Sequence, residues 1–590
     1  MSLAATLRAL PRSAALTRRG GASDKDVRSS QRALFAAAFA GILLLAIAAR
    51  RWLGVYTDDL WLLLLSDRML DGQVAYRDFL ENSPPAAILI YMPPVALARL
   101  IGVAREPVFF AYAFAVLGGV FLFCWRILAA TGRLNLIGAA GGAAALAALF
   151  LLPDYQFGQR DHFAFALASP LLTILAVRAS GGRVSRLAAI AAGVAAGAVC
   201  AIRPHYALAF SAALGFVAWR RDLRDIVRFP EISSAIAAAI AFAFGSLLAF
   251  PHYFDTALPI ALAVYVADRH SLLFVAFTPI VAAWTLLAAA YLAQASRDDD
   301  DALANVWALA SLGALLSYFV QAKGFAYHGY FAVAAMLVAV ASQRATCLKR
   351  APAFVLASLA GLAVVGLGLS GDIDSSARFE LAAGFLAIVG LARSLAPAFA
   401  PYRPPLSALG VGAAAALSFA SVHAEWRATP VFFDEVRSLV AHPKVAAIAD
   451  IGEIAHPLVS RLEGQWTQSV ISMVISQGAD AVIERQSPDA ALRAKLEAYK
   501  ALDRDIFLSD VAREPPDVVI VDETWAEKHF VDKRVDEWLA RFHKQETILL
   551  HRGGLPERFA LYVRPELLKS AVARPAAEGL RGALAPTEGR

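Results

Sequence analysis

Two adjacent carboxylates, Asp58 and Asp59, directly follow the first long apolar run of the sequence. Charged side chains beside hydrocarbon are costly, so a carboxylate pair at this position indicates a functional site. Acting as a general base, either of them could take a proton from a hydroxyl group. The competing interpretation is a helix cap, because Asp is a favoured N-cap residue and a helical run begins at Leu60. Position alone gives the two interpretations equal weight.

A second ionisable group, Arg160, Asp161 and His162, begins a later apolar run shortly after Asp154. At a membrane boundary these side chains are costly without partners. A functional role is therefore predicted for Asp161, and Arg160 and His162 are predicted to bind substrate. The alternative is a self-satisfied surface pair of Arg160 and Asp161, which would contribute little. We favour function, because the group is expected on the same membrane face as Asp58.

Cations and aromatic residues also stand in two short breaks between apolar runs. The first break holds Arg203 and His205, and an arginine offers a forked set of donors that suits phosphate. An arginine that snorkels to lipid headgroups would look the same. The second break holds Lys323, Tyr327 and His328, which suit phosphate pairing and sugar stacking, although interfacial aromatic belts have the same composition. All five are predicted substrate-binding residues.

The elements that must position these residues are membrane helices. Of the 590 residues, 58% are hydrophobic and 18% are charged, whereas about a quarter is charged in a soluble domain. Mean hydropathy is +0.56, and long apolar runs dominate residues 33–423, which is typical of membrane spans. The predicted fold class is mainly α, a polytopic membrane protein with about 13 transmembrane helices. These are expected near 33–50, 108–130, 135–152, 161–178, 187–201, 204–219, 232–251, 271–293, 302–320, 326–343, 352–369, 378–395 and 405–423.

Arginine-rich short loops alternate along the sequence, which is the positive-inside pattern. It predicts a multi-pass protein of the inner (plasma) membrane with a basic cytoplasmic tail over residues 1–32. Residues 84–103 contain two proline pairs, which break a straight helix, so an interfacial helix is expected there instead of a span. The first outer loop is then 53–107, and an odd number of spans places the C-terminus outside. These loops account for the net charge of +6, and no nucleic-acid partner is expected.

Residues 424–570 have the composition of a soluble domain. Short buried-strand patterns alternate there with helical patterns, which predicts a small α/β domain in the periplasm or another extracytoplasmic space. The strands are expected at 445–451, 517–521, 548–550 and 559–563. Residues 571–590 are rich in Ala, Pro and Gly and are expected to be disordered. No Gly-rich phosphate loop, CxxC or HExxH motif is present, so neither a metal nor a cofactor is expected.

One stretch of the first outer loop resembles a known family. Residues 72–85 read GQVAYRDFLENSPP and lead into an aromatic-bearing helical run. Together with Asp58 and Asp59, this stretch is similar to the first outer loop of the GT-C glycosyltransferases. That superfamily includes the lipid A aminoarabinose transferase and the protein O-mannosyltransferases. The resemblance covers most of residues 33–345.

The resemblance implies an inverting glycosyltransferase of the cell envelope that transfers a hexosyl or pentosyl unit. The donor would be a polyprenyl-phosphate-linked sugar, and the acceptor a glycan, lipid or protein at the outer face of the membrane. Asp58 or Asp59 matches the family's catalytic carboxylate, and Asp161 matches an acidic residue that approaches it. Arg203 resembles the family's cation that holds the lipid phosphate.

Within the motif, Tyr76, Arg77 and Glu81 are the predicted substrate-binding residues. Glu81 matches the acidic residue of the family's E-K-P element, in which Asn82 here replaces the lysine. Arg77 is the candidate to supply the missing charge. Two other functions remain open, a transporter or flippase of a lipid-linked glycan and a non-catalytic assembly subunit. Transporters more often carry charges near the bilayer midplane, whereas these charges gather on one side.

Overall fold

The computed structural model describes residues 24–153, 156–294, 301–343, 431–450, 452–552 and 555–569. The chain divides into two compact units, which we describe separately. The first, here called the helical unit, comprises Met1–Tyr56, Pro85–Ala249 and His270–Arg427. The second, here called the composite unit, comprises Thr57–Pro84, Phe250–Arg269 and Ala428–Arg590.

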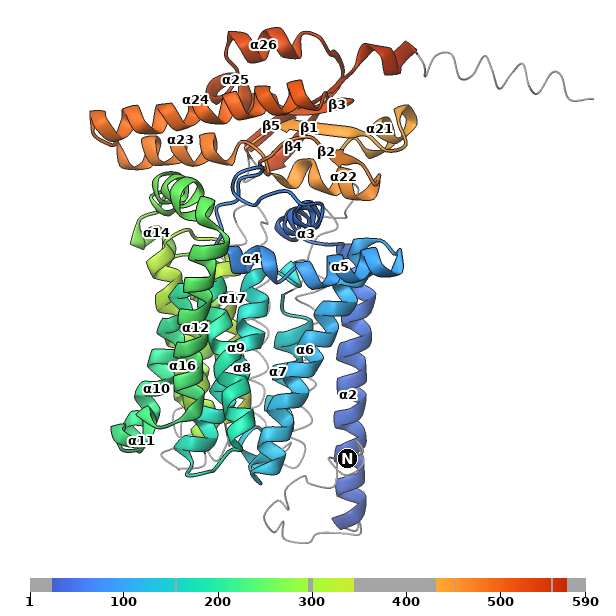
Figure 1. Ribbon diagram of the computed structural model, residues 1–590. Coiled ribbons are helices and arrows are strands. Elements are labelled where there is room, and N and C mark those ends of the chain that lie inside the picture. Colours follow the sequence, from blue (N-terminus) through green and yellow to red (C-terminus); the bar gives the residue numbers. More distant parts are fainter. Residues whose placement is uncertain are drawn as a thin grey trace, which may run out of the picture. The chain divides into compact units, whose positions relative to one another are not determined.

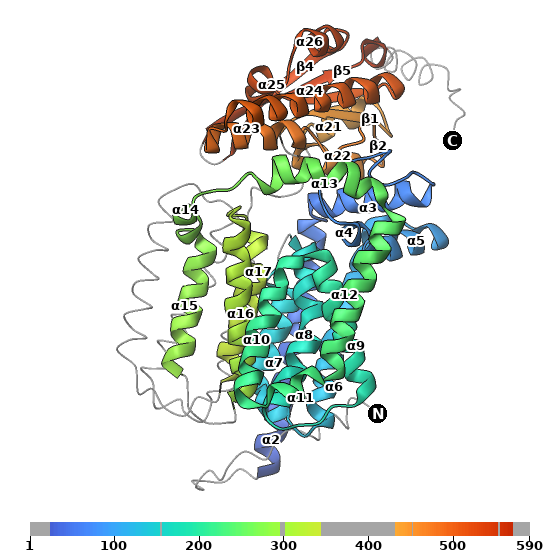
Figure 2. The same cartoon turned by 60° about the vertical axis from the view of Figure 1, so that its left-hand side comes forward.

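The helical unit is a bundle of apolar helices that stand side by side in Figures 1 and 2. Its longer helices are α2 (Asp24–Leu53), α6 (Arg105–Ala130), α7 (Gly138–Phe150), α8 (Arg160–Ala179), α9 (Arg186–Ile202), α10 (Ala207–Arg220), α12 (Pro230–Ala249), α15 (Pro279–Gln294), α16 (Ala302–Gln321) and α17 (Ala326–Ser342). Four of the described helices, α6, α8, α12 and α16, are long and apolar enough to cross a membrane. The expected multi-pass membrane protein is confirmed at this level. The count of about 13 spans stays a prediction, since 352–369, 378–395 and 405–423 lie outside the described residues, as do 1–23 and 570–590.

Helix α8 lies at the centre of this bundle. It contacts α6, α9, α10, α16 and α17, and nearly all of its residues are buried. A helix that is apolar all round is expected to be buried in this way. The ionisable triplet 160–162 forms its first turn, so the bundle carries these side chains into its interior.

Two proline effects shape the bundle. The run 84–103 is not one helix: α4 (Pro85–Leu89) and α5 (Met92–Ile101) are separated at Ile90 and Tyr91 and run across the ends of the upright helices in Figure 1. The expected span 271–293 is also broken, into α14 (Leu272–Ala276) and α15. The break precedes Pro279, because proline lacks an N–H and disfavours a helical residue before it. Shorter elements of the unit are η1 (Leu134–Leu136), η3 (Pro204–Tyr206) and α11 (Leu223–Val227).

The composite unit contains a five-stranded sheet with the order β2-β1-β3-β5-β4. Its strands are β1 (Lys444–Ile448), β2 (Gln465–Trp466), β3 (Val518–Asp522), β4 (His543–Arg552) and β5 (Leu555–Val563). Strand β1 pairs in parallel with β2 and β3, whereas β5 is antiparallel to β3 and β4. The predicted α/β region is confirmed. Its helices are α21 (Phe433–Leu439), η8 (Gly452–Ile454), α22 (His456–Arg461), α23 (Val474–Gln486), α24 (Ala490–Arg513), α25 (Glu523–His529) and α26 (Lys533–Leu539).

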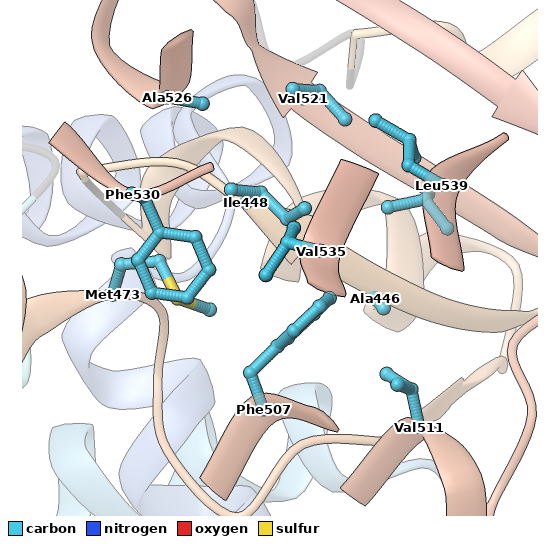
Figure 3. Close-up of a cluster of buried hydrophobic side chains, with 11 residues drawn as sticks. Ala446, Ile448, Met473, Phe507, Val511, Val521, Ala526, Phe530, Val535 and Leu539 are labelled. Carbon is cyan, nitrogen blue, oxygen red and sulfur yellow. The ribbon is translucent and has the colours of Figure 1, made fainter. Parts of the chain in front are cut away.

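The core of this domain joins the parallel strands to the helices. Figure 3 shows Ile448 of β1 and Val521 of β3 among side chains such as Phe507 of α24 and Val535 of α26. All residues of β3 are buried, which is the pattern of parallel strands covered on both faces. The strands and helices of the domain therefore share one buried apolar core.

Two segments from earlier in the chain belong to the same unit. The first is α3 (Thr57–Leu70) with the loop that follows it, and the second is a run of one α-helix and two π-helices, η4 (Tyr253–Ala257), α13 (Leu258–Ile260) and η5 (Ala261–Val266). Ile260 and Val264 pack against Ile475 and Ala479 of α23. The sequence predicted a domain over 424–570 alone, and the composite unit adds these two loops to it.

Candidate functional site

The carboxylate pair lies in the first turn of α3. Acidic side chains are stabilised there by the unsatisfied N–H groups and dipole of the helix, which agrees with the structural interpretation as well as the functional one. The two residues differ in accessibility, because Asp59 is fully buried and Asp58 is partly exposed. Asp58 is thus the carboxylate that a substrate can reach more easily.

Two of the loop residues predicted to bind substrate make hydrogen bonds that hold the loop together. Tyr76 is fully buried with a φ of 66°, and its hydroxyl donates to the Ser83 carbonyl oxygen at 2.9 Å. Glu81 accepts hydrogen bonds from Trp61 Nε1 at 2.7 Å and from the Ser83 N–H at 2.8 Å. These contacts favour structural roles for both residues.

The third loop candidate, Arg77, points into solvent. Its side chain is 56% exposed and pairs with Asp78 at 2.9 Å. The hydrogen bond to Asp78 raises the pKa of Arg77, and the same bond lowers the pKa of Asp78. An exposed pair of neighbours in sequence adds little stability, and substrate binding by Arg77 stays a prediction.

Asp161 binds two partners inside the helical unit. Its Oδ2 accepts from Arg203 Nη2 at 2.8 Å, and its Oδ1 accepts from the Tyr206 hydroxyl at 2.7 Å. The side chains of Asp161 and Arg203 are 1% and 10% exposed. Gln159 caps α8 by accepting from the Asp161 N–H, which fixes the carboxylate further. A charge-assisted pair of this kind orients the guanidinium.

His162 is engaged on both ring nitrogens. Nδ1 accepts from the Gly158 N–H at 3.0 Å, so Nε2 carries the proton and donates to the Leu149 carbonyl oxygen at 2.9 Å. The ring therefore ties the loop before α8 to the end of α7. This geometry favours a positioning role for His162 over the predicted contact with substrate.

Three cationic side chains, Arg160, Arg203 and Lys323, are buried in the same unit, with 8%, 8% and 5% exposed. We call them the cation cluster. Their charges all act electrostatically on the ring of His328, as does His205. His328 is only 1% exposed, and neither of its ring nitrogens has a hydrogen-bond partner among the described residues.

Aromatic and backbone contacts hold this region. The Tyr327 ring meets the His328 ring edge-on at 4.4 Å. Ser317 donates to the His205 carbonyl oxygen at 2.7 Å, and the break after α16 contains Ala322 at a φ of 51°. The structure thus brings Arg160, Asp161, Arg203, His205, Lys323, Tyr327 and His328 into one unit, while Asp58, Asp59, Tyr76, Arg77 and Glu81 belong to the other.

Sequence reasoning missed Tyr206 as a site residue. Its hydroxyl binds Asp161 and approaches the His328 carbonyl oxygen at 3.4 Å. Tyr206 follows Arg203 by three positions, and that spacing places two side chains on one side of a helical turn. The spacing could therefore have indicated that Tyr206 lies beside Arg203. Among the described residues, no group of three or more His, Cys, Asp or Glu could hold a metal ion. The expectation that none is required stays a prediction.

No protein family matches the sequence, and no curated protein matches it significantly. Among solved structures, the chain is similar to ArnT from Cupriavidus metallidurans bound to undecaprenyl phosphate, with a TM-score of 0.53 and 14% identity over 90% of this chain and 98% of that one. The apo state of ArnT gives a TM-score of 0.52 at the same identity and coverage. The arabinofuranosyltransferase AftD from Mycobacteria gives a TM-score of 0.38 at 13% identity and covers 90% of this chain and 41% of that one, which is too low to bear on the fold. The chain thus has an ArnT-like fold, which agrees with the predicted architecture at the level of the fold.

Proposed function

We propose that the protein is an inverting glycosyltransferase that uses a polyprenyl-phosphate-linked sugar. The acceptor would be a glycan, lipid or protein at the outer face of the inner (plasma) membrane, with the N-terminus cytoplasmic and the C-terminal domain extracytoplasmic. The observation that carries the proposal is the cation cluster, whose charges act on the buried ring of His328, a ring without a hydrogen-bond partner in the part of the chain that the structure describes. Positive charge buried in an apolar bundle marks a functional site, and Arg and Lys are the usual ligands of phosphate.

The cation cluster would hold the donor's phosphate. In the transfer step the acceptor oxygen bonds to the anomeric carbon while the bond from that carbon to the phosphate oxygen breaks. The electron pair goes to the phosphate oxygen, where Arg203 and Lys323 stabilise the developing charge. Undecaprenyl phosphate bound to ArnT supports a donor of this lipid class.

Asp161 would act through Arg203. Its two carboxylate oxygens accept from Arg203 and Tyr206, so it orients the phosphate ligand and is a poor candidate for the base. The acceptor's proton would instead go to Asp58 or Asp59, and attack from the side opposite the lipid phosphate inverts the anomeric centre. The more exposed Asp58 is the preferred base.

The test is transfer by the purified protein, reconstituted in vesicles with polyprenyl-phosphate-linked sugars. Asp58→Asn and Asp59→Asn are compared with Asp78→Asn, which changes an exposed aspartate of the same loop that pairs only locally. We expect one of the first two variants to lose transfer by about 10²-fold or more, with normal protein abundance, and the control to keep it. Full activity of both variants would contradict the assignment of the base, and lipid translocation without covalent transfer would favour a flippase.

A further inference from the structure

We propose that the C-terminal domain holds α3 in its working position and that Arg68 is the positioning residue. This inference rests on the proposed function, in which α3 carries the base. It assigns the C-terminal domain a role in the reaction without any contact with the reacting atoms. The contacts that support it all lie within the composite unit.

Arg68 lies near the C-terminal end of α3 and hydrogen-bonds to the main chain of the domain. Its Nη1 donates to the Gln468 carbonyl oxygen at 2.9 Å, and its Nη2 donates to the Trp466 carbonyl oxygen at 2.6 Å. A planar guanidinium that bonds two carbonyls of one segment fixes direction as well as distance. Asp58 lies ten residues earlier on the same helix, about 15 Å away at the usual helical rise.

The other end of α3 is held by aromatic rings. Trp61 lies one turn after Asp58, is 1% exposed, and its ring lies 5.5 Å from that of His456. The His456 ring lies in turn 4.5 Å from that of Trp466. Burial lowers the pKa of His456 to about 4, so this ring is neutral near pH 7 and donates through Nε2 to the Ile471 carbonyl oxygen at 2.9 Å. The Arg68 end of α3 therefore contacts the segment that begins at Trp466 directly, and the Trp61 end is connected to it through His456.

The loop after α3 is attached to that segment as well. The Leu80 N–H donates to the Ser469 carbonyl oxygen at 2.8 Å. Glu81, next in sequence, binds the indole of Trp61. The motif at residues 72–85 thus contacts both α3 and the domain and helps to attach one to the other.

The receiving segment, 466–469, is itself rigid. The Gln468 side chain makes two hydrogen bonds of 3.0 Å to the Ala447 N–H and carbonyl of β1. The N–H and hydroxyl of Ser469 both donate to Asp510 of α24, at 2.6 and 2.7 Å. The sheet therefore holds segment 466–469 in place, this segment holds Arg68, and α3 connects Arg68 to the carboxylates at its first turn.

The experiment compares Arg68→Met and Arg68→Lys with Arg437→Met, which changes an exposed arginine of the same unit that pairs with the exposed Asp434. Transfer kinetics are measured on the full-length reconstituted protein, together with amide hydrogen exchange of residues 57–70. We expect Arg68→Met to exchange faster there and to lower kcat by about 10²-fold, since a displacement of about 1 Å can have that effect. KM for the lipid donor should stay within about twofold, because the cation cluster that binds it is unchanged. Arg68→Lys should recover part of kcat, and Arg437→Met should behave like the wild type.

Two results would overturn the proposal: unchanged exchange at 57–70 in Arg68→Met, or an unchanged kcat despite faster exchange. If Arg68→Met also raises amide exchange in β1 and β3, its lower kcat could come from the whole domain. Arg68→Lys is then the variant that decides. A wild-type kcat together with a wild-type exchange pattern in Arg68→Lys contradicts the proposal. Failure of the proposed function looks different. In that case Asp58→Asn and Asp59→Asn both remain active, or no transfer occurs, while the exchange measurement still reports whether Arg68 holds α3.

Discussion

A buried carboxylate in the C-terminal domain gives a quantitative prediction of pH-dependent stability. Asp503 of α24 is fully buried, its Oδ2 accepts from the Ser476 N–H at 2.8 Å, and its Oδ1 has no hydrogen-bond partner among the described residues. Burial raises the pKa of Asp503 from 3.8 to about 7, although the bonds from Ser476 and the charge of Arg504 act in the opposite direction. The native domain therefore binds this proton more tightly than the unfolded chain does.

The sign and size follow from proton linkage. Between the unfolded pKa of 3.8 and the folded pKa of about 7, the folded state holds more protons, so stability falls as the pH rises. The contribution is fully present below the lower value and is lost as the pH rises through the upper one. Three pKa units amount to about 4 kcal/mol in total, of which about 2 kcal/mol falls between about pH 5.5 and about pH 8.

The assay is amide hydrogen exchange of β1 and β3 in the full-length wild type and in Asp503→Asn. An amide cannot ionise, so the variant lacks this pH dependence while keeping an oxygen that accepts from Ser476. Comparing the two proteins at the same pH cancels the intrinsic exchange rates. We expect the wild-type to variant ratio of exchange rates to rise by about 30-fold from about pH 5.5 to about pH 8. A ratio independent of pH would refute the reasoning that burial dominates the pKa of Asp503.

Two further predictions concern the helical unit. Arg203→Lys keeps the charge but loses the planar fork, so affinity for polyprenyl phosphate, measured by native mass spectrometry, should fall by about 10-fold. Arg437→Lys, at an exposed position of the other unit, should leave this affinity unchanged. Gly313→Ala should lower the thermal stability of the protein, with a destabilisation of about 1–3 kcal/mol, because the added Cβ would meet the Leu208 backbone. Gly215→Ala is the matched control, since its Cβ would meet no atom of the described residues within 4 Å. Equal stability of the two alanine variants would contradict close packing of α10 on α16.

Much of the fold follows from patterns that the sequence displays directly. Long apolar runs gave the helices of the bundle, and the proline pairs at 84–85 and 93–94 gave the break between α4 and α5. The break before Pro279 was missed because the runs on both sides are apolar, and hydropathy cannot distinguish one span from two helices. Strand β2 was missed because two residues are too few to show a period.

The site was predicted less completely, because residue type does not reveal which partner a side chain will find. His162 was expected to meet substrate, yet both of its ring nitrogens bind backbone. Tyr76 and Glu81 sit in the motif that suggested the family, yet they hold the loop. Both residues contact Ser83 within the motif, and Glu81 also contacts Trp61, 20 positions earlier, so the shape of the loop accounts for these two residues. The Asp161–Arg203 pair spans 42 positions, and nothing local signals such a contact.

Burial explains why some of these polar side chains stabilise the fold whereas others are candidates for contact with a ligand. A buried polar group must be hydrogen-bonded or it destabilises the fold, and Glu81, His162 and Asp161 meet that requirement within the protein. A group that meets it only when a ligand is bound stays unbonded in the free protein. His328 is 1% exposed and unbonded on both ring nitrogens among the described residues, so within the helical unit its ring is the strongest candidate for direct contact with the donor. If so, His328→Ala should weaken donor binding while leaving the fold intact, whereas His162→Ala should disturb the start of α8.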